Sequence, residues 1–174
     1  MIDLNKLAAE LHEAAVEKGF WDVEDAVEKH IAKMHSELSE AVQADRADIM
    51  YEVERNGAKP EGVVAELADF VMMALDYLVQ TDVTITDELS AKFEELANVP
   101  EAQNAAKACK LPQLVNSLHH AVCDAQNDDI SMLLGGLVFI HAWMSLRDYD
   151  LWEIIRTKME YNQKSRAYLH GRKY

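Results

Sequence analysis

Apolar residues recur at spacings of three and four along most of the chain, which is the period of an amphipathic α-helix. A first helix is predicted from about Asp3, a favourable N-cap residue, to Lys18, and Gly19 provides the stop. A second helix is predicted to begin between Asp22 and Asp25. Its apolar face consists of Ile31, Met34, Leu38, Ala41 and Val42.

The segment 54–62, ERNGAKPEG, is the clearest break in this pattern, because two glycines and a proline come together there. A third helix is predicted from Pro60 or Glu61 to Gln80. Its apolar stripe consists of Leu67, Phe70, Val71, Ala74 and Leu78.

The chain beyond the third helix is predicted to form a short fourth helix, which Thr86 and Asp87 can cap and which ends near Asn98. Residues 100–112 are predicted as a connector, although AQNAAKAC within that segment is compatible with a helix.

The pattern then repeats: 118–125 has the shape of 34–41, 135–146 that of 66–78, and 150–160 that of 84–94. Such self-similarity indicates a diverged internal duplication, with chance likeness between two amphipathic helix sets as the alternative. The expected organisation is a helical unit at 1–101 and a degenerate second unit at 102–174, packed as one compact domain. The acids differ between the units, because Glu37 corresponds to Ala121.

The composition favours the all-α class and a helical bundle. Only 6 Gly and 3 Pro occur, while 49% of the residues are hydrophobic and 28% are charged. No apolar run reaches the roughly 20 residues that a membrane span needs, so we expect no membrane partner and a cytoplasmic protein. Cys109 and Cys123 form no CxxC pair and are interpreted as thiols in a reducing compartment.

Charge is divided unevenly along the chain. Residues 1–101 carry a formal charge of −16 and residues 102–174 carry +2, which together give −14. An acidic body repels nucleic-acid phosphates, so a nucleic-acid partner is not expected. An acidic surface beside a basic C-terminal segment suits a cation-dependent site for a small phosphorylated ligand, or it only solubilises the protein.

Two carboxylate pairs are the sharpest candidates for chemistry: Glu37 with Glu40, and Glu66 with Asp69. Residues three apart on a helix lie about 60° apart around the axis and about 4.5 Å along it, so each pair faces one way. Both pairs adjoin the apolar stripes, where four converging carboxylates repel one another unless a cation neutralises them. Oxygen ligands of this kind suit Mg²⁺, with Mn²⁺ as an alternative.

Other metal and nucleotide sites find less support. A carboxylate-bridged di-iron bundle needs Glu-x-x-His, but Val27 and Ala32 stand three residues before His30 and His35. The sequence also contains no GxxxxGK[ST] loop and no HExxH motif.

The motifs GFW at 19–21, HSELSEA at 35–41, ELADFVMMALDYL at 66–78 and KMEYNQKSRAYLHGRKY at 158–174 resemble the MazG-like all-α nucleoside triphosphate pyrophosphohydrolases. That family combines ExxE, a gap, ExxD and a C-terminal Lys, Asn and Arg at spacings of four. The resemblance covers residues 19–78 and 158–174, and the stretch between them is extra relative to the compact members.

The resemblance implies cleavage of a nucleoside triphosphate between the α and β phosphates, which yields a monophosphate and pyrophosphate. Glu37, Glu40, Glu66 and Asp69 would then hold Mg²⁺, and Glu37 or Glu40 would also activate the attacking water. Removal of unwanted nucleotides is the expected cellular role. The alternative is a catalytically silent helical protein that binds nucleotide or acts as a scaffold.

The resemblance also implies that Lys158, Asn162 and Arg166 contact the phosphates and the sugar. Their spacing of four turns each residue about 40° from the last, which predicts a polar and basic ridge on one face of the last helix. A solvated helix face would produce the same ridge. The acids precede residue 102 and this ridge follows it, so one site built across the two units is expected, with one nucleotide per chain.

Three further residues bear on the site. Many family members have another Glu directly before the first pair, and Ser36 stands there, which leaves the number of metal ions open. Asp76 shares the helix face of Asp69 two turns away and could bond a sugar or base, or simply sit at a helix–helix edge. Trp21 could stack on a base or belong to the core. The sequence leaves homo-oligomer formation open.

Overall fold

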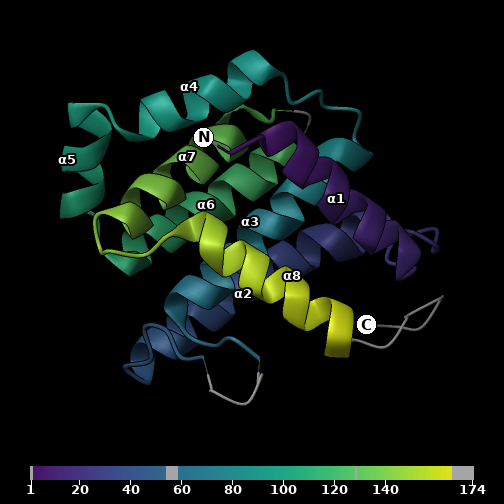
Figure 1. The fold of residues 1–174 in the computed structure, drawn as a ribbon, viewed down its shortest axis with the longest axis horizontal. Helices are drawn as coiled ribbons and strands as arrows, with labels where there is room; N and C mark the ends of the chain where they lie inside the picture. The colour runs from purple at the N-terminus through teal and green to yellow at the C-terminus, as the bar shows by residue number, and fades with distance from the viewer. Residues whose placement is uncertain (1, 54–58, 128, 166–174) are drawn as a thin grey trace.

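The computed structural model describes residues 2–53, 59–127 and 129–165. The described residues form α-helices and no β-strand, which confirms the all-α class (Figure 1). The helices are α1 (Leu4–Glu17), α2 (Ala26–Arg46), α3 (Val63–Gln80), α4 (Asp87–Ala97), α5 (Pro100–Ala108), α6 (Leu111–Gln126), α7 (Ser131–Ser145) and α8 (Leu151–Ser165).

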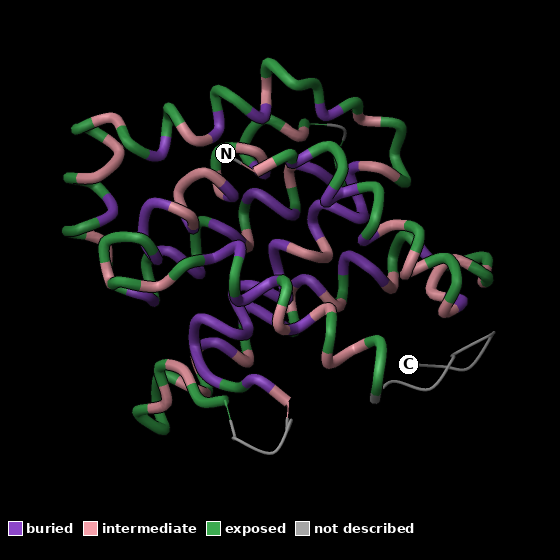
Figure 2. Tube along the Cα trace, viewed as in Figure 1, coloured by how far each residue is buried: buried purple, intermediate pink, exposed green. Residues whose placement is uncertain are grey.

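Helix α3 is the centre of the bundle. Its sequence is apolar around most of its circumference, so it is stable only when other helices cover it on all sides. Helices α1, α2, α7 and α8 all pack against it. Figure 2 shows the buried segments gathered in the middle of the bundle and the exposed ones along its outer turns.

The predicted helix ends are confirmed at the positions where a capping residue was identified. The Asp3 carboxylate accepts a hydrogen bond from the Lys6 amide at 2.9 Å, and the Thr86 hydroxyl accepts one from the Leu89 amide at 3.1 Å. Gly19 follows α1 with a φ of 79°, the left-handed conformation in which a glycine ends a helix without strain.

The connector predicted at 100–112 is wrong for most of its length. Helix α5 occupies nine of these residues, and only Cys109 and Lys110 separate it from α6. Pro100 lies in the first turn of α5 and Pro112 in the first turn of α6, where no amide hydrogen is needed for the hydrogen bonds of the helix. The two prolines therefore begin helices here and do not mark a loop.

The packing of α1–α4 corresponds to that of α5–α8. Helices α1 and α2 pack on α3, as α5 and α6 pack on α7, and the last helix of each set crosses to the other: α8 packs on α3 and α4 packs on α7. Helices α2 and α6 meet through His35 and His119, whose Nδ1 atoms lie 2.7 Å apart. A duplication would produce this arrangement, and it remains a prediction. One hydrophobic cluster contains residues of both sets.

The start of α3 is fixed by the segment before it. The amides of Val63 and Val64 donate to the carbonyls of Ile49 and Met50, at 3.0 and 3.1 Å. Gly62 adopts a φ of 106°, and a Cβ at this position would lie 2.8 Å from the Met50 carbonyl oxygen. Only glycine fits both constraints, so Gly62 fixes the position from which Glu66 and Asp69 project.

We therefore predict that Gly62→Ala lowers the free energy of unfolding by about 2 kcal/mol or more, because it adds left-handed strain and a backbone clash. Gly135→Ala is the matched control, since a Cβ there meets no atom within 4 Å and the position lies inside α7. That variant should gain about 0.5–1 kcal/mol. Urea denaturation of both variants measures the difference, and equal stability of the two would contradict the assigned role of Gly62.

Candidate functional site

Three carboxylates of the two predicted pairs meet between α2 and α3. One oxygen each from Glu37, Glu40 and Glu66 lies within 4.8 Å of the others. Glu37 and Glu40 are one helical turn apart on α2, and Glu66 lies in the first turn of α3. The spacing of three therefore does what the sequence predicted and directs the pair on α2 toward α3.

This cluster is electrostatically strained. Burial, with further contributions from Asp69, Glu40 and Glu66, raises the pKa of Glu37 to about 7. Burial also raises the pKa of Glu66, against the opposing effects of Lys158 and Lys59. The Oε2 atom of Glu66 is buried without a hydrogen-bond partner. An unpartnered buried carboxylate oxygen among like charges is a favourable ligand for a cation.

Asp69 is held by a lysine from the other end of the chain. The ammonium of Lys158, on α8, lies 2.7 Å from Asp69 Oδ2 and 4.0 Å from Glu66 Oε2, and it donates to the Ala65 carbonyl at 2.8 Å. Lys158 is only 2% exposed. A buried ammonium needs charged and polar partners, and these three oxygens supply them. Lys158 is therefore buried beside the carboxylates and is not part of a solvated helix face.

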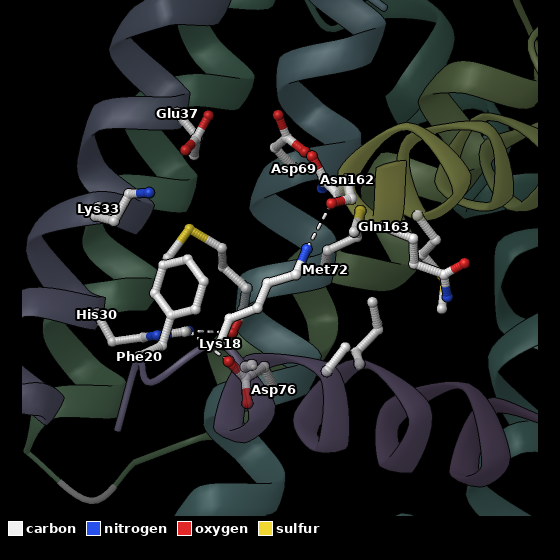
Figure 3. A pocket seen from close by; sticks show the side chains of 15 residues that line it. Lys18, Phe20, His30, Lys33, Glu37, Asp69, Met72, Asp76, Asn162 and Gln163 are labelled. Carbon is white, nitrogen blue, oxygen red and sulfur yellow. Dashed lines mark hydrogen bonds and ion pairs between the residues drawn. The ribbon is translucent and has the colours of Figure 1, made fainter. Parts of the chain in front are cut away.

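A cavity extends from these acids along α3. Glu37 and Asp69 lie at one end and His30 and Asp76 at the other, with Phe20 and Met72 between them (Figure 3). The empty space among these side chains is about 750 Å³, and this figure includes solvent at the open mouth. The seven residues from Asp69 to Asp76 correspond to a helical rise of about 10 Å, so an elongated ligand can reach both ends.

The far end of the cavity is a polar cluster around Asp76. Its Oδ1 accepts a hydrogen bond from the indole N–H of Trp21 at 3.1 Å, and it lies 2.7 Å from His12 Nδ1. His30 Nε2 donates to the Met73 carbonyl at 2.8 Å and lies 3.5 Å from Asp76 Oδ2. Three helices, α1, α2 and α3, bring these groups together with the segment that carries Trp21.

Burial changes the protonation of this cluster. It raises the pKa of Asp76 to about 6, although the hydrogen bonds from His12 and Trp21 oppose the shift. It lowers the pKa of His30 to about 4, so His30 is neutral near pH 7. Because its Nε2 hydrogen is directed to the Met73 carbonyl, the ring is fixed in one tautomer.

The remaining predicted residues fall in different places. Asn162 lines the cavity, and its backbone carbonyl accepts a hydrogen bond from Lys18 Nζ at 2.6 Å. Ser36 donates to Glu40 Oε1 at 2.9 Å, so it orients a carboxylate of the cluster. Trp21 contacts Asp76 and stacks on His30 at 4.6 Å between ring centroids. Arg166 lies outside the described residues.

Several residues of the candidate site were not predicted, among them His12, which contacts Asp76. Lys33 lines the cavity and lies one helical turn before Glu37, a spacing of four that could have been recognised in the sequence. His12 and Lys18 come from α1 and its C-cap, and no local pattern links them to residues on α3 or α8.

The chain matches no protein-family model, no curated protein and no solved structure. Among the described residues, no helix combines the length and the apolar character that a membrane span requires.

The raised pKa of Glu37 leads to a prediction for the pH dependence of the stability of the metal-free protein. The folded state binds this proton more tightly than the unfolded chain, so the contribution of Glu37 to folding declines as pH rises from 4.5 to about 7. The free energy of unfolding of the parent chain, relative to Glu37→Gln, should fall by up to about 3 kcal/mol over that window and level off above it.

Urea titrations in the presence of a chelator, at several pH values between about 5 and 8, measure this difference. Comparing the two chains cancels the effects of His30 and Asp76, which titrate in overlapping ranges in both. Stability curves that run parallel for the two chains would show that Glu37 has no raised pKa.

Proposed function

We propose that the protein is a Mg²⁺-dependent nucleotide pyrophosphohydrolase, which cleaves a nucleoside triphosphate between the α and β phosphates. One observation carries the proposal: Glu37, Glu40 and Glu66 converge, and Glu37 and Asp69 form one end of a cavity that extends about 10 Å along α3. The family resemblance of the motifs that contain these residues points to the same reaction.

Glu37, Glu40 and Glu66 would hold the cation, and Asp69 would complete the acidic end. The donor set fits, because its oxygens converge and one of them, Glu66 Oε2, is buried without a partner. A bound Mg²⁺, or Mn²⁺ in its place, would polarise the phosphoryl oxygens of the substrate.

In this reaction a water oxygen forms a bond to the α-phosphorus, and the bond from that phosphorus to the bridging oxygen breaks. The pyrophosphate leaves with the bonding electrons, and a carboxylate oxygen of Glu37 takes the proton of the water. Glu37 is suited to this step because it lines the cavity, where the substrate would bind. Glu40, on the same helix face, is held by Ser36 and would keep the ligand set in place.

The cations around the cavity would divide two tasks. Lys158 is already bound to Asp69 and Ala65, so we assign it to balancing the buried carboxylates. Lys33 and Lys18 line the open part of the cavity, where they would meet the phosphates. Asn162, on α8, would contact the sugar or the phosphates.

We further propose one such site per chain, in a chain that arose by duplication. Ala121 stands where Glu37 has its counterpart in the other half, and Lys92, the counterpart of Lys158, is exposed and paired with Glu88 at 2.6 Å. A second site, built on α6 and α7 with α4, therefore lacks both the acid and the buried ammonium, and the second half contributes Lys158 and Asn162 to the site of the first half.

A nucleotide panel tests the reaction. The chain is incubated with ribo- and deoxyribonucleoside triphosphates and Mg²⁺, and the products are separated by ion-exchange chromatography. Monophosphate and pyrophosphate in equal amounts are expected. Diphosphate and orthophosphate would refute the assigned cleavage, and nucleotide binding without turnover would support the catalytically silent alternative.

The acidic cluster gives the first variant. Glu40→Gln should abolish turnover and most of the rise in melting temperature that Mg²⁺ causes in the parent chain, because it removes one ligand charge. Glu28→Gln, an exposed acid on the same helix, is the control and should retain both properties. Turnover at the parent rate in Glu40→Gln would eliminate the metal assignment.

The buried lysine, Lys158, gives the second variant. Lys158→Met keeps the aliphatic length but leaves Asp69 and Glu66 without their cation, so the metal-free chain should lose about 3–5 kcal/mol of unfolding free energy. Lys92→Met, at the corresponding exposed position, should cause no measurable loss. Saturating Mg²⁺ should recover part of the loss in Lys158→Met, measured by urea denaturation. If the two lysine variants lose the same stability, Lys158 is not the balancing charge.

A further inference from the structure

The two oxygens of the Asp76 carboxylate have different surroundings. Oδ1 receives the Trp21 indole N–H and is within hydrogen-bond distance of His12 Nδ1. Oδ2 faces His30 Nε2 at 3.5 Å, but the hydrogen of that atom is directed to the Met73 carbonyl. Among the described residues no hydrogen bond is formed to Oδ2, which leaves it as an acceptor at the end of a cavity that Asp76 lines.

A ligand that reaches this end must therefore bring a hydrogen-bond donor. The walls before it are apolar and are formed by the Phe20 ring and by Met72, Met73, Ala14 and Ala15. A flat, weakly polar ring fits between such walls, and a donor on its outer edge would then point at Asp76. The acids that would hold the triphosphate lie at the opposite end, about 10 Å away along α3.

Nucleobases differ in what they present at that edge. Cytosine and adenine carry an exocyclic amino group, which projects from the ring and donates hydrogen bonds. Uracil and thymine carry a carbonyl oxygen at the equivalent position, and this oxygen would be set against an anionic carboxylate. A buried acceptor that receives no donor is costly, so it discriminates strongly between such pairs.

We propose that Asp76 selects cytosine and adenine nucleotides, whose exocyclic amino group would donate to Oδ2, and that it rejects uracil and thymine nucleotides. The proposal rests on the proposed function only for the orientation of the ligand, with its phosphates at the acidic end. Trp21 and His12 are positioning residues, because they hold Oδ1 and thereby turn Oδ2 toward the cavity.

The test uses dCMP and dUMP in the presence of Mg²⁺ as probes, because a monophosphate has no phosphoanhydride bond to hydrolyse and the cation shields its phosphate from the carboxylates. Dissociation constants are measured by calorimetry near pH 8, where Asp76 is ionised because its pKa is about 6. The parent chain should bind dCMP about tenfold or more tightly than dUMP, as expected for one hydrogen bond to a charged acceptor. Equal affinities, tighter binding of dUMP, or no binding of either nucleotide would overturn the proposal.

The variant Asp76→Asn should reverse the preference between dCMP and dUMP. Trp21 and His12 should keep the amide oxygen at the position of Oδ1, so the amide N–H₂ would take the place of Oδ2 and donate. The preference should then invert in favour of dUMP. Trp21→Phe is the control, since it should weaken dCMP binding without inverting the preference. Melting curves establish that each variant is folded, and an unchanged ratio in folded Asp76→Asn would overturn the assignment.

These outcomes are separable from those of the proposed function. Selective dCMP binding by a chain that hydrolyses no triphosphate would retain the base-reading role of Asp76 and reject the reaction. Hydrolysis without discrimination between dCMP and dUMP would retain the reaction and reject the role of Asp76.

Discussion

The buried contact between Lys158 and Asp69 is the interaction on which the candidate site depends. Helix α3 places Glu66 and Asp69 in the interior, where Glu37 also approaches, and carboxylates in that environment repel one another. A single ammonium at 2.7 Å from Asp69 offsets part of that repulsion, and it comes from α8, the last described helix of the chain. The same contact thus allows the acids to be buried and fixes α8 against α3. The ammonium approaches Glu66 Oε2 only to 4.0 Å and leaves it without a hydrogen bond, so the balance is incomplete where a cation would bind.

The geometry of α3 links this acidic end to the polar cluster around Asp76. Asp69 and Asp76 project from the same face two turns apart, with Met72 and Met73 between them. Their surroundings give them different chemistry: Asp69 faces an ammonium, whereas Asp76 faces the indole N–H of Trp21 and His30, which burial keeps uncharged near pH 7. One helix face can therefore bind the charged end of an elongated ligand at one point and read its uncharged end at another.

How far the sequence predicts this arrangement depends on the range of each interaction. The helix caps at Asp3 and Thr86, and the convergence of Glu37 with Glu40, follow from spacings of three, which are visible in the sequence. The burial of Lys158 cannot be predicted in this way, because its partners on α3 precede it by about 90 residues. The spacing of four that it shares with Asn162 would equally suit a solvated helix face. The contact of His12 with Asp76 spans 64 residues, and no periodicity encodes it. The connector predicted from the two prolines is wrong for a local reason, because proline is as favourable in the first turn of a helix as in a loop.

The crossing of α8 onto α3 and of α4 onto α7 lets the acidic and the basic part of the chain share one core. Each half supplies its last helix to the other, so the ammonium that α3 requires has to come from α8. On the opposite side, α7 has no buried carboxylates among its core residues, and Lys92 on α4 accordingly remains at the surface with Glu88. Burying a lysine costs several kcal/mol unless carboxylates compensate it, so the absence of acids on α7 and the exposure of Lys92 belong together. A chain that retained the acids of the first half without α8 would keep the repulsion and lose the charge that offsets it, and the site is therefore a property of both halves.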